Sequence, residues 1–258
     1  MTPNSPISNS CFKLKTLFLV HLYVGLSVFS LFSPSLYQLF WATFDEGFAR
    51  LLQAWACNSP LLQNFWAMAN HRIADIVEDV FFLFFFLWLL KTTPSQEKLR
   101  KTAEFLFVSL VTTAVILFIN NFLFKQVVHI PRKSPSLVLD AFPRLSEQIS
   151  WLQVKDKSKV CFPSDHATTA LLFIANFLYL SKNKLLRASA CLYGTFLCFP
   201  RMVAGAHWIT DILLGSASLV LLIFSWVFCT PFADFCIRHL HRFLLLLKKT
   251  FPYNRAPS

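Results

Sequence analysis

Six long apolar runs divide the sequence and limit the folds that the chain can adopt. They cover approximately Leu14–Phe32, Ile73–Leu90, Ala103–Phe124, Ala167–Leu180, Leu185–Pro200 and Ile209–Cys229. A helix needs about 20 mostly apolar residues to cross a bilayer, and the fourth and fifth runs reach that length only with flanking residues. Only 14% of the residues are charged, well below the share of roughly a quarter in soluble domains. The sequence therefore predicts an all-α fold, a bundle of six transmembrane helices.

The net charge of +11 is distributed unevenly across such a bundle. With six spans, one face carries the N-terminus, the segments near 91–102 and 181–188 and the C-terminal tail, and the whole excess of Lys and Arg lies there. Cytoplasmic flanks of membrane helices are rich in these residues, so we expect both termini in the cytoplasm. The positive charge is thereby explained by topology, and no nucleic-acid partner is expected.

The sequence predicts three consecutive regions. Residues 1–12 form a polar N-terminal tail, residues 13–235 one transmembrane catalytic domain, and residues 236–258 a basic amphipathic tail at the cytoplasmic surface. The first run lacks an A-x-A-like cleavage site after it, so we interpret it as an uncleaved anchor. Residues 125–166 are the longest polar stretch, and a loop of this length is usually functional or disordered.

A shorter amphipathic segment lies within residues 35–66. Apolar residues spaced by three and four positions indicate a helix, and such a helix suits the outer membrane interface, where it would lie flat. A helix packed over the bundle fits the pattern equally well. The stripe is Phe48, Leu51, Leu52 and Trp55, preceded by Asp45 and Glu46.

Three polar clusters stand at the ends of the expected helices, all on the extracytoplasmic side. Charged side chains at membrane depth are costly and usually face a polar cavity. We therefore expect the clusters to converge on one site. They are Lys125 with Arg132, then Ser164, Asp165 and His166, and finally Arg201, His207 and Asp211.

The residue types in these clusters fit phosphoryl transfer. This reaction needs positive groups around the phosphate oxygens, and Lys125, Arg132 and Arg201 can supply them. Ser164 offers a hydroxyl at a helix N-terminus, where free N–H groups favour an anion. No third carboxylate joins a His pair, so we expect no metal and no other cofactor.

The two histidines suit two different roles in that chemistry. His207 and Asp211 are four residues apart, which would make them neighbours on one helical face. A carboxylate bonded to one ring nitrogen fixes the tautomer and leaves the other nitrogen free to attack phosphorus. His166 then remains as the proton donor.

Each residue alone has a structural alternative. His166 or His207 could be an ordinary buried histidine, Lys125 and Arg132 could be solvated or snorkelling charges, and Ser164 could be only an N-cap. A non-enzymatic lipid-phosphate binding or transport protein could also use the same cavity. The order and spacing of all three clusters together favour an enzyme.

The pattern K-x6-R, P-S-x-H and R-x5-H-x3-D resembles the type 2 phosphatidic acid phosphatase (PAP2) superfamily of membrane lipid phosphatases over roughly residues 60–230. The resemblance implies a six-helix bundle of the PAP2/haloperoxidase type and a metal-independent mechanism through a phosphohistidine. It further implies that His207 is the nucleophile, Asp211 its orienting partner and His166 the general acid. The phosphate-binding residues would be Lys125, Arg132, Ser164 and Arg201, with Asp165 beside them.

Three positions depart from the general pattern, namely Lys133, Asp165 and Pro200. The last two resemble features of one branch of the superfamily, which transfers phosphate from undecaprenyl diphosphate to lipid A 1-phosphate at the periplasmic face of the bacterial inner membrane. The likeness implies these lipids as partners, with water as the alternative acceptor. It lies in Asn70-His-Arg72 with Asp75, Arg132-Lys-Ser-Pro-Ser-Leu137, Phe162-Pro-Ser-Asp-His166, Phe199-Pro-Arg201, Gly205-Ala-His-Trp208, and Thr230-Pro231 with Asp234.

Overall fold

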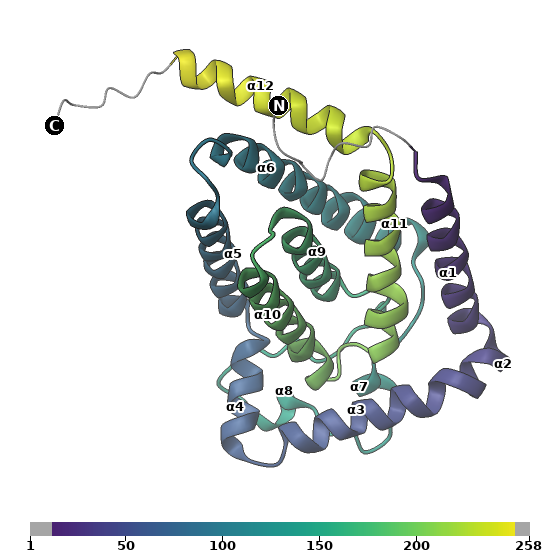
Figure 1. The fold of residues 1–258 in the computed structure, drawn as a ribbon. Helices are drawn as coiled ribbons and strands as arrows, with labels where there is room; N and C mark the ends of the chain where they lie inside the picture. Colours follow the sequence, from purple (N-terminus) through teal and green to yellow (C-terminus); the bar gives the residue numbers. More distant parts are fainter. Residues whose placement is uncertain (1–11, 251–258) are drawn as a thin grey trace.

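The computed structural model describes residues 12–250, in which the regular elements are all helices (Figure 1). The longer ones are α1 (Leu14–Phe32), α3 (Ala42–Ala56), α4 (Pro60–Ala69), α5 (Arg72–Thr92), α6 (Lys98–Ala114), η2 (Val115–Val128), α9 (Asp165–Leu180), α10 (Lys184–Val203), α11 (Ala217–Phe228) and α12 (Phe232–Thr250). The shorter ones are α2 (Pro34–Leu36), η1 (Tyr37–Trp41), α7 (Pro135–Val138), α8 (Leu145–Gln148) and η3 (Asp211–Ser216). The predicted all-α class is thus confirmed for this part of the chain. Most of the expected N-terminal tail (1–11) and the end of the C-terminal tail (251–258) lie outside the described residues.

A helix forms at each of the six apolar runs. Three helical stretches among the described residues are long and apolar enough to cross a membrane: α1, α6 continued by η2, and η3 continued by α11. The α9 helix has only 16 residues, while α5 and α10 include charged residues near their ends. The described residues therefore contain three candidate membrane-spanning helices, and the count of six stays a prediction.

The α9 helix lies at the centre of the bundle, with α5, α6, α10 and α11 around it (Figure 1). Its aromatic residues form much of the contact. The ring centroids of Phe85 and Phe173 are 5.1 Å apart, and those of Phe173 and Phe177 are 4.8 Å apart, within the range of favourable aromatic pairs. Gly194 lets α10 approach closely, because a Cβ atom there would lie 2.5 Å from Cγ1 of Ile174.

The two ends of the bundle differ in what covers them. The short helices α7 and α8 lie at one end with α3 and α4, whereas α12 crosses the opposite end (Figure 1). A hydrogen bond of 3.0 Å from Lys13 N to Cys229 O joins the start of α1 to the end of α11 at the α12 end. The α12 helix begins at Phe232, before the expected boundary at residue 236, and buries Ala233 and Ile237.

The amphipathic segment forms α3, but its buried face differs from the predicted stripe. Leu51 and Trp55 are 65% and 46% exposed, whereas Asp45, Ala49 and Leu52 are buried. These positions also recur at helical spacing, so the helix presents a carboxylate to the bundle on its packing face. The structure supports a helix packed over the bundle, and an additional place at the membrane interface stays a prediction.

Candidate active site

The polar stretch between η2 and α9 is folded onto itself by backbone hydrogen bonds. Cys161 N donates to Arg132 O over 2.9 Å, and Ser134 N donates to Ser158 O over 2.9 Å. These bonds place the segment that follows η2 beside the segment that precedes α9. The first two sequence clusters, which are far apart in the chain, are thereby brought to the same end of the bundle as α7 and α3.

Ser164 is the buried N-cap of α9, as the sequence predicts. Its Oγ accepts a hydrogen bond of 3.4 Å from Ala167 N, and its hydroxyl donates no hydrogen bond to residues 12–250. Its carbonyl oxygen accepts from Oγ1 of Thr168 at 2.7 Å and from Oγ of Ser216 at 2.8 Å. The bond from Ser216 fixes the start of α9 against η3.

The first group of charged side chains surrounds His166. Nζ of Lys125 lies 2.6 Å from Oδ2 of Asp165, whose Oδ1 lies 3.3 Å from Nδ1 of His166. Nε2 of His166 lies 2.9 Å from Nη2 of Arg201 and 3.5 Å from Oδ1 of Asp75. Asp165, one of the three departures from the general pattern, is thus paired with a lysine. It also lies in the first turn of α9, where the helix dipole favours negative charge.

The environment of this group favours a charged imidazole. Burial and the neighbouring Arg201 lower the pKa of His166, but the hydrogen bonds with Asp165 and Asp75 outweigh them and raise that pKa above its usual value. Burial raises the pKa of Asp165, but His166 and Lys125 outweigh it and hold that pKa well below its usual range. A histidine whose pKa is raised holds its proton to a higher pH than a free imidazole, which suits it to donate that proton to a leaving group.

The second group surrounds Arg132, which bonds to two buried carboxylates. Its Nη1 binds Oδ1 of Asp211, and its Nη2 lies 2.7 Å from Oδ2 of Asp45 and 2.8 Å from Oγ1 of Thr210. Both carboxylate side chains are fully buried. The guanidinium therefore joins α3 to the start of η3.

His207 lies in the turn between α10 and η3, so the expectation that it shares a helical face with Asp211 is wrong. The α10 helix ends at Val203, and the backbone reverses at Gly205, where φ is +77°. Nδ1 of His207 lies 2.7 Å from Cys161 O and 3.7 Å from Oδ2 of Asp211. The carbonyl can only accept, so Nδ1 carries the proton and Nε2 keeps a free lone pair.

Asn70 and Asp45 are site residues whose roles sequence reasoning missed. Oδ1 of Asn70 binds Nη1 of Arg201, and Nδ2 of Asn70 donates to Pro200 O over 3.2 Å. Pro200 lies inside α10 and has no N–H to donate, but its carbonyl is used in this way. The sequence did contain a signal for Asp45. Its carboxylate falls on the same helical face as Ala49 and Leu52 and interrupts an otherwise apolar packing face.

All eight predicted site residues thus come to the same end of the bundle. The two groups are linked through the chain and through hydrogen bonds, since Cys161 contacts His207 and lies three residues before Ser164. Arg201, which contacts His166, lies at the end of the helix that leads to His207. The arrangement offers cations, a serine hydroxyl, a proton donor and a ring nitrogen with a free lone pair.

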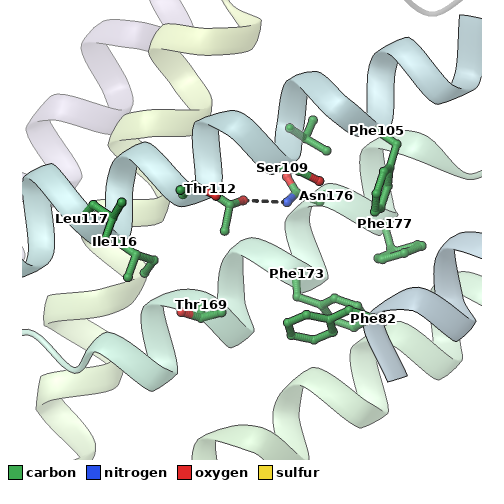
Figure 2. A pocket seen from close by; sticks show the side chains of 12 residues that line it. Phe82, Phe105, Ser109, Thr112, Ile116, Leu117, Thr169, Phe173, Asn176 and Phe177 are labelled. Atoms are coloured by element: carbon green, nitrogen blue, oxygen red, sulfur yellow. Dashed lines mark hydrogen bonds between the residues drawn. The ribbon is translucent and has the colours of Figure 1, made fainter. Parts of the chain in front are cut away.

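A cavity of about 380 Å³ extends from this end of α9 along the bundle, between α5, α6 and α9 (Figure 2). One end of the cavity lies next to the site, because its lining residue Thr169 is one helical turn from Asp165 and donates from Oγ1 to Asp165 O over 3.1 Å. Its walls are mainly apolar and include Phe82, Phe173 and Phe177. One polar crossing lies within it, the 3.0 Å hydrogen bond from Nδ2 of Asn176 to Oγ1 of Thr112 (Figure 2).

Comparison with known proteins supports the chemistry that this geometry suggests. The protein is similar to lipid A 1-diphosphate synthase of Escherichia coli K12, with 29% identity over 215 residues, which is 82% of this chain and 86% of the relative. No solved structure matches it significantly. The model of the PAP2 superfamily matches residues 103–234, more than half of the chain. The protein is therefore a phosphatase or phosphotransferase that belongs to the PAP2 superfamily.

Proposed function

We propose that the protein takes the terminal phosphate from undecaprenyl diphosphate and transfers it to lipid A 1-phosphate through a phosphohistidine at His207. One observation carries the proposal: Nδ1 of His207 is bound to Cys161 O, which leaves Nε2 as a nucleophile at the end of the bundle that holds the cations. The similarity to a lipid A 1-diphosphate synthase supports the choice of lipids. His166 is the general acid, and Lys125, Ser164 and Arg201 hold the phosphate together with Arg132, through N–H groups other than those that bind Asp211, Asp45 and Thr210.

In the first step, Nε2 of His207 attacks the terminal phosphorus and the bond to the bridging oxygen breaks. His166 gives its proton to that oxygen, and undecaprenyl phosphate leaves. In the second step, an oxygen of the acceptor attacks the phosphorus, the P–N bond breaks, and its electron pair returns to Nε2. The acceptor proton passes to His166, which restores the starting state.

The alternative acceptor is water, which would make the protein an undecaprenyl diphosphate phosphatase. Lys155 favours a phosphate acceptor, because it is a cationic residue next to the site: its carbonyl oxygen accepts a 3.4 Å hydrogen bond from Asn70, which also binds Arg201. Burial lowers the pKa of Lys155, and Arg201 and Lys125 lower it further against the opposing effect of Asp165 and Asp75. The negative charge of a phosphate acceptor that still carries one proton would offset this excess of positive charge, whereas water would not.

The cavity beside α9 supports a lipid substrate with a long chain. Its apolar length begins one helical turn from Asp165, where the diphosphate would lie. We propose that it receives the first isoprene units of undecaprenyl diphosphate. The domain of residues 13–235 would then hold both the headgroup and the start of the chain.

The arrangement of the ends supports a site at the periplasmic face of the inner membrane. The basic helix α12 lies at the opposite end from α3 (Figure 1), and such clusters are attracted to the anionic cytoplasmic leaflet. Both termini would then be cytoplasmic, as the distribution of Lys and Arg predicts.

The reaction is tested with undecaprenyl diphosphate labelled at its terminal phosphate. The purified protein is incubated with this lipid in detergent, with and without lipid A 1-phosphate. Label on lipid A supports the transferase, and label released as inorganic phosphate with both mixtures supports the phosphatase instead. No movement of label in either mixture, with folded protein, would contradict both and leave a binding or transport function.

Blocking the cavity should weaken the use of long-chain substrate selectively. Ser109→Trp places a large side chain in the cavity and should raise the KM for undecaprenyl diphosphate about tenfold, or about 1.4 kcal/mol. The KM for a diphosphate with two isoprene units should change little. Leu110→Trp is the matched control, because Leu110 is 61% exposed on the same helix. Equal effects of both variants on both substrates would contradict a chain-binding cavity.

Removing the Asp75 carboxylate, which lies 3.5 Å from Nε2 of His166, should change the pH dependence of turnover. A general acid must be protonated, so kcat/KM falls as the pH rises through its pKa. Asp75 is one of the groups that raise the pKa of His166, so Asp75→Asn should move the alkaline limb of the profile to lower pH. Asp79→Asn is the control on the same helix. An unchanged limb in Asp75→Asn would show that His166 does not give the proton.

A further inference from the structure

We propose that Asp45, on α3, is a positioning residue that orients Arg132 and the start of η3 for phosphoryl transfer. This inference rests on the proposed function and adds a residue outside the region that matches the PAP2 superfamily, residues 103–234. Its basis is the set of four hydrogen bonds that the Asp45 carboxylate accepts from three different segments.

Three of the four hydrogen bonds of Asp45 come from Arg132 and Thr210, and the fourth comes from Tyr37 in η1. Oδ2 lies 2.7 Å from Nη2 of Arg132, 2.7 Å from Oγ1 of Thr210 and 3.0 Å from the hydroxyl of Tyr37. Oδ1 accepts from the backbone N–H of Thr210 over 3.1 Å. Thr210 directly precedes Asp211, the other carboxylate on Arg132. Asp45 therefore fixes both the guanidinium of Arg132 and Thr210, the residue directly before Asp211.

Stability alone does not account for this arrangement. Asp45 and Asp211 are both fully buried, and they share one guanidinium. A buried ion pair often contributes little net stability, because the cost of removing both charges from water offsets their attraction. Two carboxylates on one cation leave a further negative charge buried. Such a cluster is better explained by a need for a fixed geometry and charge at the site.

The extra negative charge has a use in the reaction. When Nε2 of His207 takes up phosphorus, the imidazole ring becomes positive. Oδ2 of Asp211 lies 3.7 Å from the ring, but Arg132 balances the charge of Asp211. The charge of Asp45 leaves the cluster negative overall, so it favours the positive ring as it forms. This effect is larger in the transition state than with bound substrate, so it acts on kcat more than on KM.

The test compares Asp45→Asn with Glu46→Gln, a charge removal at the next residue. Glu46 is half exposed and pairs with Arg50 at the surface. Asn keeps an oxygen for Thr210 but loses the charge and the ion pair to Arg132. We expect Asp45→Asn to lower kcat about 10- to 100-fold, the range for a misplaced catalytic geometry, with KM changed less than threefold. Glu46→Gln should keep wild-type kinetics.

A stability control separates positioning from a purely structural role. Val220→Ala removes buried side-chain volume in the cluster around Leu172, away from Asp45, and is measured at the same temperature below melting. Positioning predicts a much lower kcat for Asp45→Asn than for Val220→Ala when the two are equally folded. A kcat that follows only the folded fraction in both variants would overturn the proposal.

A second variant covers the case in which Asp45→Asn does not fold. Thr210→Val keeps the shape of the side chain but removes the hydroxyl that contacts both Asp45 and Arg132, and kcat should fall about tenfold at constant KM. If the wild-type protein transfers label and either Thr210→Val or Asp45→Asn keeps the wild-type kcat, the inference about Asp45 is contradicted and the proposed function is not. Absence of transfer by the wild-type protein would instead contradict the proposed function.

Discussion

His207→Ala should reduce the release of the terminal phosphate from undecaprenyl diphosphate by about 10⁴-fold or more, because loss of a covalent nucleophile removes the whole first step. Nδ1 of His207 is held by Cys161 O, so only Nε2 of this ring is free for the attack. The measurement is the initial rate of label release in detergent at saturating substrate. The same reaction, stopped quickly with base, should leave acid-labile label on the wild-type protein and none on His207→Ala.

The matched control for this variant is His239→Ala. His239 is exposed on α12 and its ring contacts Phe235 O within the same helix, at the end of the bundle opposite to α3. The His239→Ala variant should keep the wild-type rate of label release and the acid-labile label on the protein. Label retained on His207→Ala, or turnover within tenfold of wild type, would place the covalent step on another residue. The most direct candidate would then be His166.

The elements that follow from local pattern could be predicted from the sequence. The helix at each apolar run, the helical segment within residues 35–66 and Ser164 as the first residue before α9 all depend on spacing and on local capping. Convergence of the three clusters could also be anticipated, because costly charges near helix ends favour a shared polar cavity. Predicting these features does not require knowing which face of each helix packs against its neighbours.

The pairings within the site could not be predicted, because they depend on contacts between distant segments. Asp45 and Arg132 are 87 residues apart, and Asn70 and Arg201 are 131 apart. The interpretation of His207 failed for a local reason. Residues four apart share a helical face only on a continuous helix, but Gly205, at φ +77°, follows the end of α10, and the next helical residues begin at Ile209, after His207. A Cβ atom at Gly205 would also lie 2.6 Å from Cε1 of Phe142.

The effect of these long-range pairs on folding is largest at Arg132. Arg132→Ala would leave Asp45 and Asp211 buried without their shared cation, and breaking a buried pair in this way costs about 3–5 kcal/mol. We expect a correspondingly lower free energy of unfolding in detergent. Arg50→Ala is the control, because Arg50 pairs with Glu46 at the surface, where both side chains are about half exposed. Such a pair contributes about 0–1 kcal/mol.

The pH dependence of the Arg132→Ala deficit identifies its cause. Burial already keeps the pKa of Asp45 above its usual value despite the opposing effect of Arg132, and loss of the guanidinium raises it further. A carboxyl group with a raised pKa in the folded state binds its proton more readily there than in the unfolded chain, so folding gains stability as the pH falls. The stability difference between Arg132→Ala and wild type should therefore shrink from neutral pH toward acidic pH, and adding Asp45→Asn to Arg132→Ala should recover part of it at neutral pH. A deficit that stays constant with pH and is not reduced by Asp45→Asn would mean that lost packing around the arginine side chain, rather than the two unpaired carboxylates, destabilises the protein.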